Sequence, residues 1–366
     1  TITFVVNIED VTAKILPYLS ADLTGPARED SLAALSAELI SKATEGTHYE
    51  ADVRSFYNGN QYILFVNETF RDVRLVGAPP ESIGKFGHDT DNWVWPRHTG
   101  DFSMFRVYTS PDGTPAEYSP DNIPLKPRHF LPISLKGYEK GDFEMILGFP
   151  GSTDRYMTSW EVEELLDITH PNRIKIRGVK QDIMMKDMLS SEEINIKYSA
   201  KYSRSSNYWK YSIGQTNGLN NLGVVERKKD LEAEFLKWID ENNKENYANT
   251  FKLIQTGVEK RKSILHSSQY LFECMYSGME TVQLGNSIRF LYQEVSSGNP
   301  DEARVAMLKN YARNAAEEFY KDYNFPTDKK VSLAMLQLMI DDVEDEFLPT
   351  SVKEVKTKYN GDVDKF

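Results

Sequence analysis

The chain has 366 residues, of which 40% are hydrophobic and 12% aromatic, so it is long enough for two domains with substantial cores. Its formal net charge of −12 argues against nucleic-acid phosphates or an anionic membrane surface as partners, because both require a basic face. No apolar run approaches the roughly 20 residues of a membrane-spanning helix. The single cysteine, Cys274, lies in an apolar pattern that predicts a buried structural thiol.

Residues 1–155 carry the pattern of short strands separated by turns. The turn signals include Asn58-Gly59, and a helical pattern with Leu32, Leu35, Leu39 and Ile40 on one face interrupts the strands. Short strands with proline and glycine turns predict an antiparallel barrel. The predicted strands cover residues 1–6, 55–65, 69–78, 101–109, 130–133 and 142–148, and the predicted helices cover 11–19 and 28–43.

Residues 156–366 have long helical patterns instead. Apolar residues recur every three or four positions, which is typical of faces that pack against other helices. The sequence therefore predicts an α+β protein with a strand-rich first part and a helical second part. The predicted helices cover residues 225–242, 248–266, 269–295, 303–320 and 328–347.

Residues 91–108 combine an aromatic, polar segment with a strand pattern. Two tryptophans, a proline, an asparagine and a histidine fall within residues 92–98, and a roughly alternating apolar pattern follows from Phe102 to Tyr108. Asp101 stands at the head of this strand, directly after a glycine. Chymotrypsin-like proteases place there the carboxylate that orients their catalytic histidine, so Asp101 is a candidate triad acid.

The other two members of such a triad have no convincing candidates. Of the six histidines, only His48 precedes Asp101 by tens of residues, and its neighbours are typical of a solvated entry to a strand. Gly285-Asn286-Ser287 lies in a helical pattern and lacks the glycine that should follow a nucleophilic serine. Residues 148–153 predict a tight barrel corner rather than a nucleophile turn.

The string Asn92-Trp93 followed by Trp95-Pro-Arg-His-Thr-Gly-Asp-Phe-Ser103 resembles the signature of the S46 peptidases. These are exported bacterial dipeptidyl-peptidases of the dipeptidyl-peptidase 7 and 11 type. Gly141-Asp-Phe, Leu147-Gly-Phe-Pro-Gly-Ser152 and Ser206-Asn-Tyr-Trp209 resemble the same family, so the resemblance covers essentially the whole chain. It implies part of a chymotrypsin-like antiparallel double β-barrel in residues 1–155 and an incomplete α-helical cap domain in 156–366.

The resemblance also implies roles for individual residues. Asp101 matches the triad acid, and Asn92, Trp93 and Asn207 match residues that hold the free amino end of a peptide. Asparagine carbonyls accept hydrogen bonds from an ammonium group, and a tryptophan face attracts a cation. The family's histidine would lie upstream of residue 1 and its serine downstream of residue 366, so we expect an internal fragment that is inactive by itself.

The same resemblance implies the setting of the parent protein. We expect its substrates to be oligopeptides with a free amino terminus, and we expect no cofactor, no metal, no nucleic acid and no membrane insertion. The parent is expected in the periplasm or on the surface of a Gram-negative bacterium, where a homodimer is an option.

Two other readings of the sequence stay open. His88, Asp89 and Asp91 could place nitrogen and oxygen ligands around a divalent ion. Alternatively, the chain is a non-catalytic peptide-binding module, with an amine pocket and no chemistry. At the level of single residues, Asp101 could cap a turn, Trp93 could be a core residue and Asn207 could belong to an ordinary turn; Trp95 is expected in the packing.

Overall fold

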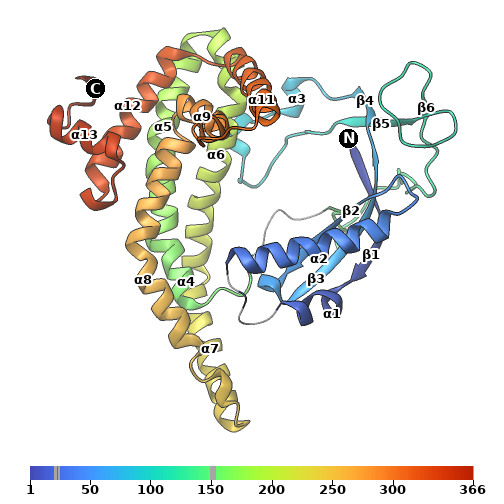
Figure 1. The fold of residues 1–366 in the computed structure, drawn as a ribbon, viewed down its shortest axis with the longest axis horizontal. Coiled ribbons are helices and arrows are strands. Elements are labelled where there is room, and N and C mark those ends of the chain that lie inside the picture. The colour runs from blue at the N-terminus through green and yellow to red at the C-terminus, as the bar shows by residue number, and fades with distance from the viewer. Residues whose placement is uncertain (20–22, 24, 149–153, 366) are drawn as a thin grey trace. The chain divides into compact units, whose positions relative to one another are not determined.

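The structure is a computed structural model that describes residues 1–19, 23, 25–148 and 154–365. It consists of two compact units, and the chain passes between them more than once (Figure 1). The first unit holds Thr1–Phe86 and His98–Ile146, and the second holds Gly87–Arg97 and Leu147–Phe366. The short segment Gly87–Arg97 thus belongs to the helical unit, although its neighbours on both sides belong to the strand-rich unit.

The first sheet of the strand-rich unit is antiparallel, with strand order β1-β3-β2. β2 and β3 are joined by a tight turn in which Tyr57 and Asn58 have φ values of 50° and 55°. The predicted strand 55–65 was wrong because it ran through this turn, which the Asn58-Gly59 signal itself marks. The strands are β1 (Ile2–Asp10), β2 (Glu50–Phe56) and β3 (Gln61–Phe70).

One face of this sheet is covered by helices, with α2 lying along it (Figure 1). Alternate residues of β3, namely Tyr62, Leu64 and Val66, are buried against Val11 and Ile15, as expected for a strand with one face in a core. The predicted apolar face of residues 28–43 is confirmed, since its four residues pack on the same core. The helices are α1 (Thr12–Ile15), the 3₁₀ turn η1 (Leu16–Tyr18) and α2 (Pro26–Thr44).

The second sheet is shorter, with antiparallel order β4-β5-β6. β5 begins at Met104, so Asp101 precedes the strand by three residues instead of opening it. Residues 130–133 and 142–148 form no strand, and their apolar side chains are exposed, Ile133 to 90% and Ile146 to 98%. Residues 149–153, most of the predicted barrel corner, lie outside the described residues. The remaining elements are β4 (Asp72–Gly77), α3 (Glu81–Gly84), β5 (Met104–Thr109) and β6 (Ile123–Pro124).

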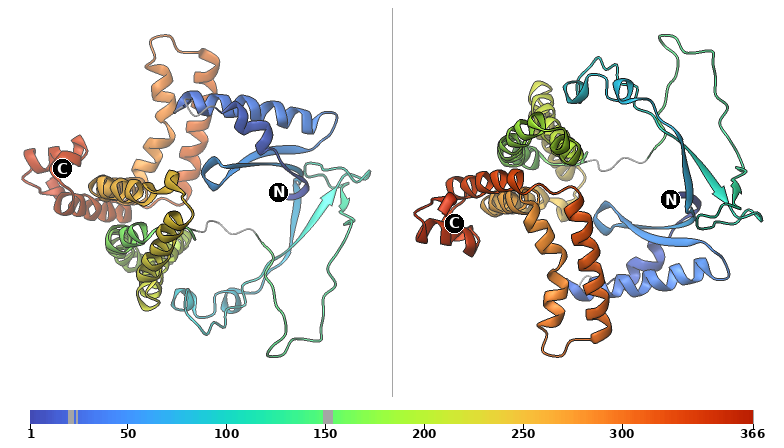
Figure 2. Two further views of the ribbon diagram at one scale, coloured as in Figure 1. Left: turned by 90° about the horizontal axis from the view of Figure 1, so that it is seen from below. Right: turned by 90° about the horizontal axis from the view of Figure 1, so that it is seen from above.

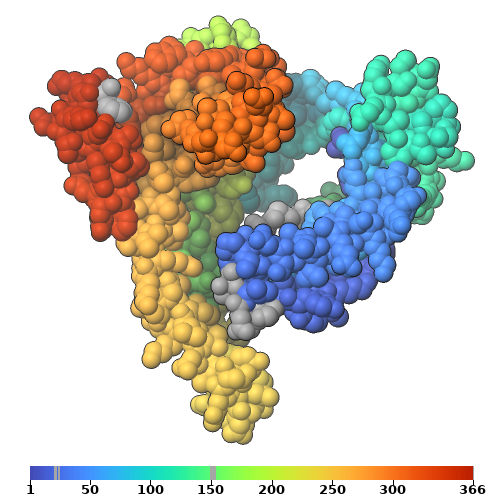
Figure 3. Space-filling view, in the orientation of Figure 1, coloured from blue at the N-terminus to red at the C-terminus, as the bar shows by residue number. Residues whose placement is uncertain are grey.

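The helical unit is built around α5 and α6, which form a hairpin joined at Ser191. The Ser191 hydroxyl accepts a hydrogen bond from the backbone N–H of Ile194 and so caps α6. α10 and α11 lie side by side (Figure 2), and the turn after α7 forms the yellow, protruding end of this unit (Figure 3). The first helices are α4 (Ser159–Glu164), the π-helix η4 (Leu165–Thr169), α5 (His170–Ser190), α6 (Glu192–Asn221) and α7 (Val224–Glu241).

The predicted helix over 269–295 is interrupted in the structure. A π-helix, η6, and a turn at Gly278 separate α8 from two shorter helices. The later elements are the 3₁₀ turn η5 (Glu245–Tyr247), α8 (Thr250–Tyr270), η6 (Leu271–Tyr276), α9 (Glu280–Ser287), α10 (Arg289–Val295), α11 (Glu302–Lys321), α12 (Phe325–Asp342), η7 (Asp345–Phe347), α13 (Thr350–Lys358) and η8 (Val363–Lys365).

The core of the helical unit lies where α5, α6, η6 and α12 meet. Ile176, Tyr198, Tyr270 and Met335 are almost completely buried there. Cys274 is 0% exposed in the same core, which confirms the predicted buried thiol, and burial raises the pKa of that thiol above its usual range. None of the helices within the described ranges is long and apolar enough to cross a membrane.

Candidate functional site

The segment Gly87–Arg97 is held on helix α6 by a polar contact at its first turn, η3 (His88–Asp91). The hydroxyl of Ser206 lies 2.8 Å from both carboxylate oxygens of Asp89 and donates to them. The Lys210 ammonium donates to the backbone carbonyl of Asp89 and lies 3.5 Å from its carboxylate. Because Ser206 is fully buried, this contact fixes the place of η3 on the helix.

The next two residues of the segment meet Asn207, the neighbour of Ser206. The Oδ1 atom of Asn207 accepts a 2.9 Å hydrogen bond from the indole Nε1 of Trp93 and a 3.3 Å bond from Nδ2 of Asn92. The structure therefore brings together the three residues that the family resemblance linked to the substrate amine. They come from positions 92–93 and 207, so only the fold unites them.

Trp93 is held in an unusual backbone conformation. Its φ of 58° lies in the left-handed region, which is rare for a bulky side chain and recurs at functional sites. The indole ring packs on Tyr211, with 5.6 Å between ring centroids, and the residue remains 58% exposed. Trp95, by contrast, is 88% exposed, so its expected place in the packing was wrong.

The hydrogen-bond pattern separates the roles of the two asparagines. A carbonyl oxygen has two lone pairs, and both lone pairs of Asn207 Oδ1 are occupied by Asn92 and Trp93. Asn92 donates through Nδ2, and its Oδ1 accepts no hydrogen bond from any described residue. The site thus offers one free amide oxygen next to an exposed indole face, and both groups attract an ammonium.

Asp101 lies in the strand-rich unit, just before β5. The preceding turn is fixed by hydrogen bonds from Gly100 N–H to the Ile83 carbonyl, at 3.0 Å, and from the Thr99 hydroxyl to the Phe86 carbonyl, also at 3.0 Å. The residue is exposed, and its carboxylate makes no hydrogen bond or ion pair with any residue that the structure describes. It is therefore accessible to a further group.

Three of the six histidines, His48, His170 and His266, have partners other than Asp101. Nε2 of His48 lies 2.7 Å from a carboxylate oxygen of Glu68, so His48 pairs with that residue and not with Asp101. His170 is buried and bonds to Thr216, and its burial lowers the pKa of its imidazole. His266 bonds to Asn172 and to the backbone carbonyl of Asp342. These contacts are those of structural histidines.

The alternative of a metal site at His88, Asp89 and Asp91 gains no support. Among the described residues, no three histidine, cysteine or acidic side chains come close enough to hold an ion. Asp89 is engaged by Ser206 and Lys210. Asp91 lies against Gly87, where an added Cβ would sit 2.0 Å from its Oδ2. The sequence string contributes instead to docking the segment on α6.

Sequence reasoning did not identify Asp89, Ser206 and Lys210 as the residues that position the site. Asp89 and Ser206 are separated by 117 residues, and no local pattern signals a contact over that distance. The only clue was the position of Ser206 next to Asn207 in the string Ser206-Asn-Tyr-Trp209.

The chain is similar to curated dipeptidyl-peptidases. The chain is 39% identical over 367 residues to dipeptidyl-peptidase 7 of Porphyromonas endodontalis, covering 100% of the chain and 44% of the relative. It is 39% identical over 358 residues to the Asp/Glu-specific dipeptidyl-peptidase of Capnocytophaga gingivalis, covering 98% of the chain and 50% of the relative. The chain thus spans about half the length of the curated relatives it matches.

The fold is also that of a solved structure. The crystal structure of Porphyromonas endodontalis DPP11 in complex with the dipeptide Arg-Glu matches with a TM-score of 0.85 and 35% identity, over 98% of this chain and 52% of that chain. The family model of the S46 peptidases matches residues 1–366. With its residues matched from end to end, the chain belongs to the peptidase S46 family.

Proposed function

We propose that this chain is part of a serine dipeptidyl-peptidase that releases dipeptides from the free amino ends of oligopeptides. The relatives are named dipeptidyl-peptidases, and one solved relative holds a dipeptide. The observation that carries the proposal is the meeting of Asn92 and Trp93 at Asn207 Oδ1, which leaves a free carbonyl oxygen beside an exposed indole.

Recognition of an amino end follows from the chemistry of these groups. The Oδ1 atom of Asn92 accepts a hydrogen bond from the ammonium, and the face of Trp93 adds cation–π attraction of about 0.5–2 kcal/mol. Asn207 holds both side chains by accepting from them, so it positions the site. An anchored ammonium fixes the distance along the peptide, which is what an enzyme needs in order to cut after the second residue.

In this proposal Asp101 orients the histidine of a Ser-His-Asp triad and stabilises its imidazolium. The exposed, unpaired carboxylate of Asp101 supports that role. The proposal places the histidine and the serine outside residues 1–366, and for that reason the isolated chain is expected to be inactive. It also treats the two three-stranded antiparallel sheets as part of a chymotrypsin-like double barrel. Export to the periplasm or cell surface is part of the same proposal.

The amine site is tested by Asn207→Ala in a full-length protein that contains the chain. The comparison is kcat/KM for matched peptides with free and with acetylated amino ends. We expect kcat/KM for the free-amine peptide to fall about tenfold to a hundredfold, because one or two hydrogen bonds to a charged group are lost. For the acetylated peptide, kcat/KM should change little. Asn217→Ala, an exposed change on the same helix, serves as control. Equal losses for both peptides would exclude an amine role.

The catalytic role of Asp101 is tested separately by Asp101→Asn. We expect kcat to fall by about three to four orders of magnitude, because the amide no longer holds the catalytic tautomer of the histidine. Asp121→Asn, another exposed aspartate of the strand-rich unit, should leave kcat unchanged. Near-normal turnover of Asp101→Asn would exclude the triad assignment, and binding of peptides without turnover by the unaltered protein would favour a binding module.

A further inference from the structure

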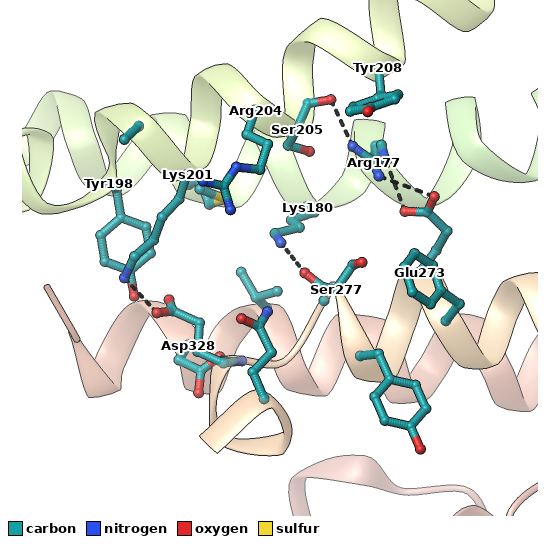
Figure 4. Close-up of a pocket in the computed structure, with 18 of the residues that line it drawn as sticks. Arg177, Lys180, Tyr198, Lys201, Arg204, Ser205, Tyr208, Glu273, Ser277 and Asp328 are labelled. Carbon is teal, nitrogen blue, oxygen red and sulfur yellow. Dashed lines mark hydrogen bonds and ion pairs between the residues drawn. The ribbon is translucent and has the colours of Figure 1, made fainter. Parts of the chain in front are cut away.

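The helical unit contains a cavity of about 1040 Å³ that is distinct from the Asn92–Trp93–Asn207 site. Helices α5, α6, α9, α10 and α12 and the π-helix η6 supply its walls, and charged side chains from several of them point into it (Figure 4). Six of the lining residues are cationic and four are acidic. The cationic ones are Arg173, Arg177, Lys180, Lys201, Arg204 and Arg289.

Three of the four carboxylates are neutralised or fully hydrogen-bonded within the protein. Glu273 lies 3.4 Å from Arg173 Nε and 2.8 Å from Arg177 Nε. Glu280 lies 2.5 Å from Lys201 Nζ. Asp328 accepts hydrogen bonds from the backbone N–H groups of Glu280 and Thr281, at 2.9 and 3.4 Å. The fourth, Asp322, is the only carboxylate of the cavity without such a contact among the described residues.

Three of the cations have no carboxylate partner, so positive charge is in excess. Arg289 lies over the ring of Phe290, 4.7 Å from its centroid. Arg204 makes no hydrogen bond or ion pair with any residue that the structure describes. Lys180 donates one hydrogen bond, of 2.5 Å, to the backbone carbonyl of Ser277. With six cationic and four acidic side chains, the wall carries a formal surplus of two positive charges.

Arg204 and Lys180 face the same part of this space. Figure 4 shows the Arg204 guanidinium, from α6, and the Lys180 ammonium, from α5, both directed into the cavity. The ammonium has two N–H groups left after its bond to Ser277, and the guanidinium has five. Burial, and then the nearby charge of Arg177, lower the pKa of Lys180 to about 8, although the charges of Glu280, Glu273 and Asp328 act in the opposite direction.

The backbone on the opposite wall is specially shaped. η6 is a π-helix, a conformation that is rare in proteins and frequent at functional sites. The residue after it, Ser277, accepts a hydrogen bond from Lys180 at its carbonyl, and a Cβ on Gly278 would lie only 2.0 Å from the carbonyl oxygen of Cys274. The wall that positions Lys180 thus depends on an irregular turn and a glycine.

We propose that this cavity binds a small anion with several carboxylate or phosphate oxygens, held between Arg204 and Lys180. A guanidinium fork matches two oxygens of such a group, and an ammonium contacts a third as a point charge. The amide side chains of Gln283 and Asn286, which also line the cavity, provide neutral donors for the rest of the ligand.

The experiment uses isothermal titration calorimetry of the chain with citrate and, separately, with inorganic phosphate. Sodium chloride at equal ionic strength corrects for screening, and the two anions distinguish a polycarboxylate from a phosphate ligand. We expect one of them to bind with one-to-one stoichiometry. Arg204→Gln and Lys180→Met should each weaken that binding at least tenfold.

Lys260→Gln is the matched control, because it removes one positive charge from an exposed position on α8 outside the cavity. It should leave the affinity unchanged. Arg204 is itself exposed, so Arg204→Gln is expected to fold. It therefore tests the anion site even if Lys180→Met fails to fold. The proposal is overturned if neither anion binds beyond the chloride baseline, if Arg204→Gln binds like the unaltered chain, or if Lys260→Gln weakens binding equally.

Discussion

The hydroxyl of Ser206 lies 2.8 Å from both carboxylate oxygens of Asp89, and this buried contact ties the segment that carries Asn92 and Trp93 to helix α6. Ser206→Ala removes the donor and leaves the carboxylate with Lys210 alone. We expect local opening of the segment to become easier by about 1–2 kcal/mol. The hydrogen-bonded amides of Asp91 and Val94 should then exchange with solvent about tenfold faster, measured by hydrogen–deuterium exchange.

Ser199→Ala is the control for this contact. Ser199 stands on the same helix, but its hydroxyl donates to the carbonyl of Asn195 one turn away, at 2.6 Å. It should change the exchange of residues 87–97 little. Equal acceleration in both variants would show that the Asp89–Ser206 bond is not what holds the segment.

The ends of a helix could be predicted from the sequence where the helix carries its own apolar period and cap. α7 and α11 were predicted within two residues of their observed ends, because each carries its own amphipathic period and α11 its own acidic cap, Asp301. The ends could not be predicted where the helical period of apolar residues is interrupted. A π-helix slips the side-chain register by one residue, and η6 was predicted as part of one continuous helix with α9 and α10, over residues 269–295.

The candidate site shows the same division. Asn92 and Trp93 could be singled out from their string, and Asn207 from a weaker one, but the pattern of donors and acceptors among them needs the fold. The cavity around Lys180 could not be predicted from the sequence, because its charged residues come from six helical elements and the C-terminal end of α11 and alternate with ordinary packing residues. Strand predictions in residues 130–148 failed because apolar runs predict strands only where a partner strand is available.

Asp72 in β4 should make the stability of the second sheet depend on pH. It is 2% exposed and accepts hydrogen bonds from Arg74, at 2.9 and 2.7 Å, and from Asn122, at 2.8 Å. The bonds from Arg74 above all lower the pKa of Asp72 to about 2. A lowered folded-state pKa stabilises the fold above the ordinary value of 3.8, and this contribution is lost as the pH falls through 2.

We therefore expect Asp72→Asn to be less stable than the unaltered chain at pH 7, with a difference that shrinks between pH 5 and pH 2. All five tryptophans lie in the helical unit, so the measurement is hydrogen–deuterium exchange of the β4 and β5 amides. Asp121→Asn, at an exposed position, should show no such trend. A difference that stays constant over this pH range would contradict the assigned role of the ionised carboxylate.

Lys180 should make the stability of the helical unit depend on pH in the alkaline range. The pKa of Lys180 is lowered from 10.5 to about 8 in the folded chain, so the unfolded chain binds more protons between these values. The contribution of Lys180 to stability therefore rises with pH through that window. Relative to Lys180→Met, the unaltered chain should gain about 2–3 kcal/mol of unfolding free energy from pH 7 to pH 10.

Urea unfolding followed by tryptophan fluorescence reports on the helical unit and provides this comparison. Lys186→Met, an exposed change on the same helix, controls for the general effect of pH on the chain. If the unfolding free energies of Lys180→Met and Lys186→Met changed equally between pH 7 and pH 10, the cavity would not disfavour the charge of Lys180.

Alanine at two glycine positions of the helical unit should change the free energy of unfolding in opposite directions. A Cβ at Gly278 would lie 2.0 Å from the carbonyl oxygen of Cys274 and 2.9 Å from that of Glu273, and both atoms belong to the backbone of η6, which cannot move aside like a side chain. At Gly285, in α9, a Cβ meets no described atom within 4 Å. We expect Gly278→Ala to cost at least about 2 kcal/mol of unfolding free energy, and Gly285→Ala to add about 0.5–1 kcal/mol through its higher helix propensity. Urea unfolding followed by tryptophan fluorescence measures both. If Gly278→Ala left the free energy of unfolding unchanged, the close turn after η6 would not be required for stability. The turn would then not explain how Ser277 is placed to accept the hydrogen bond from Lys180.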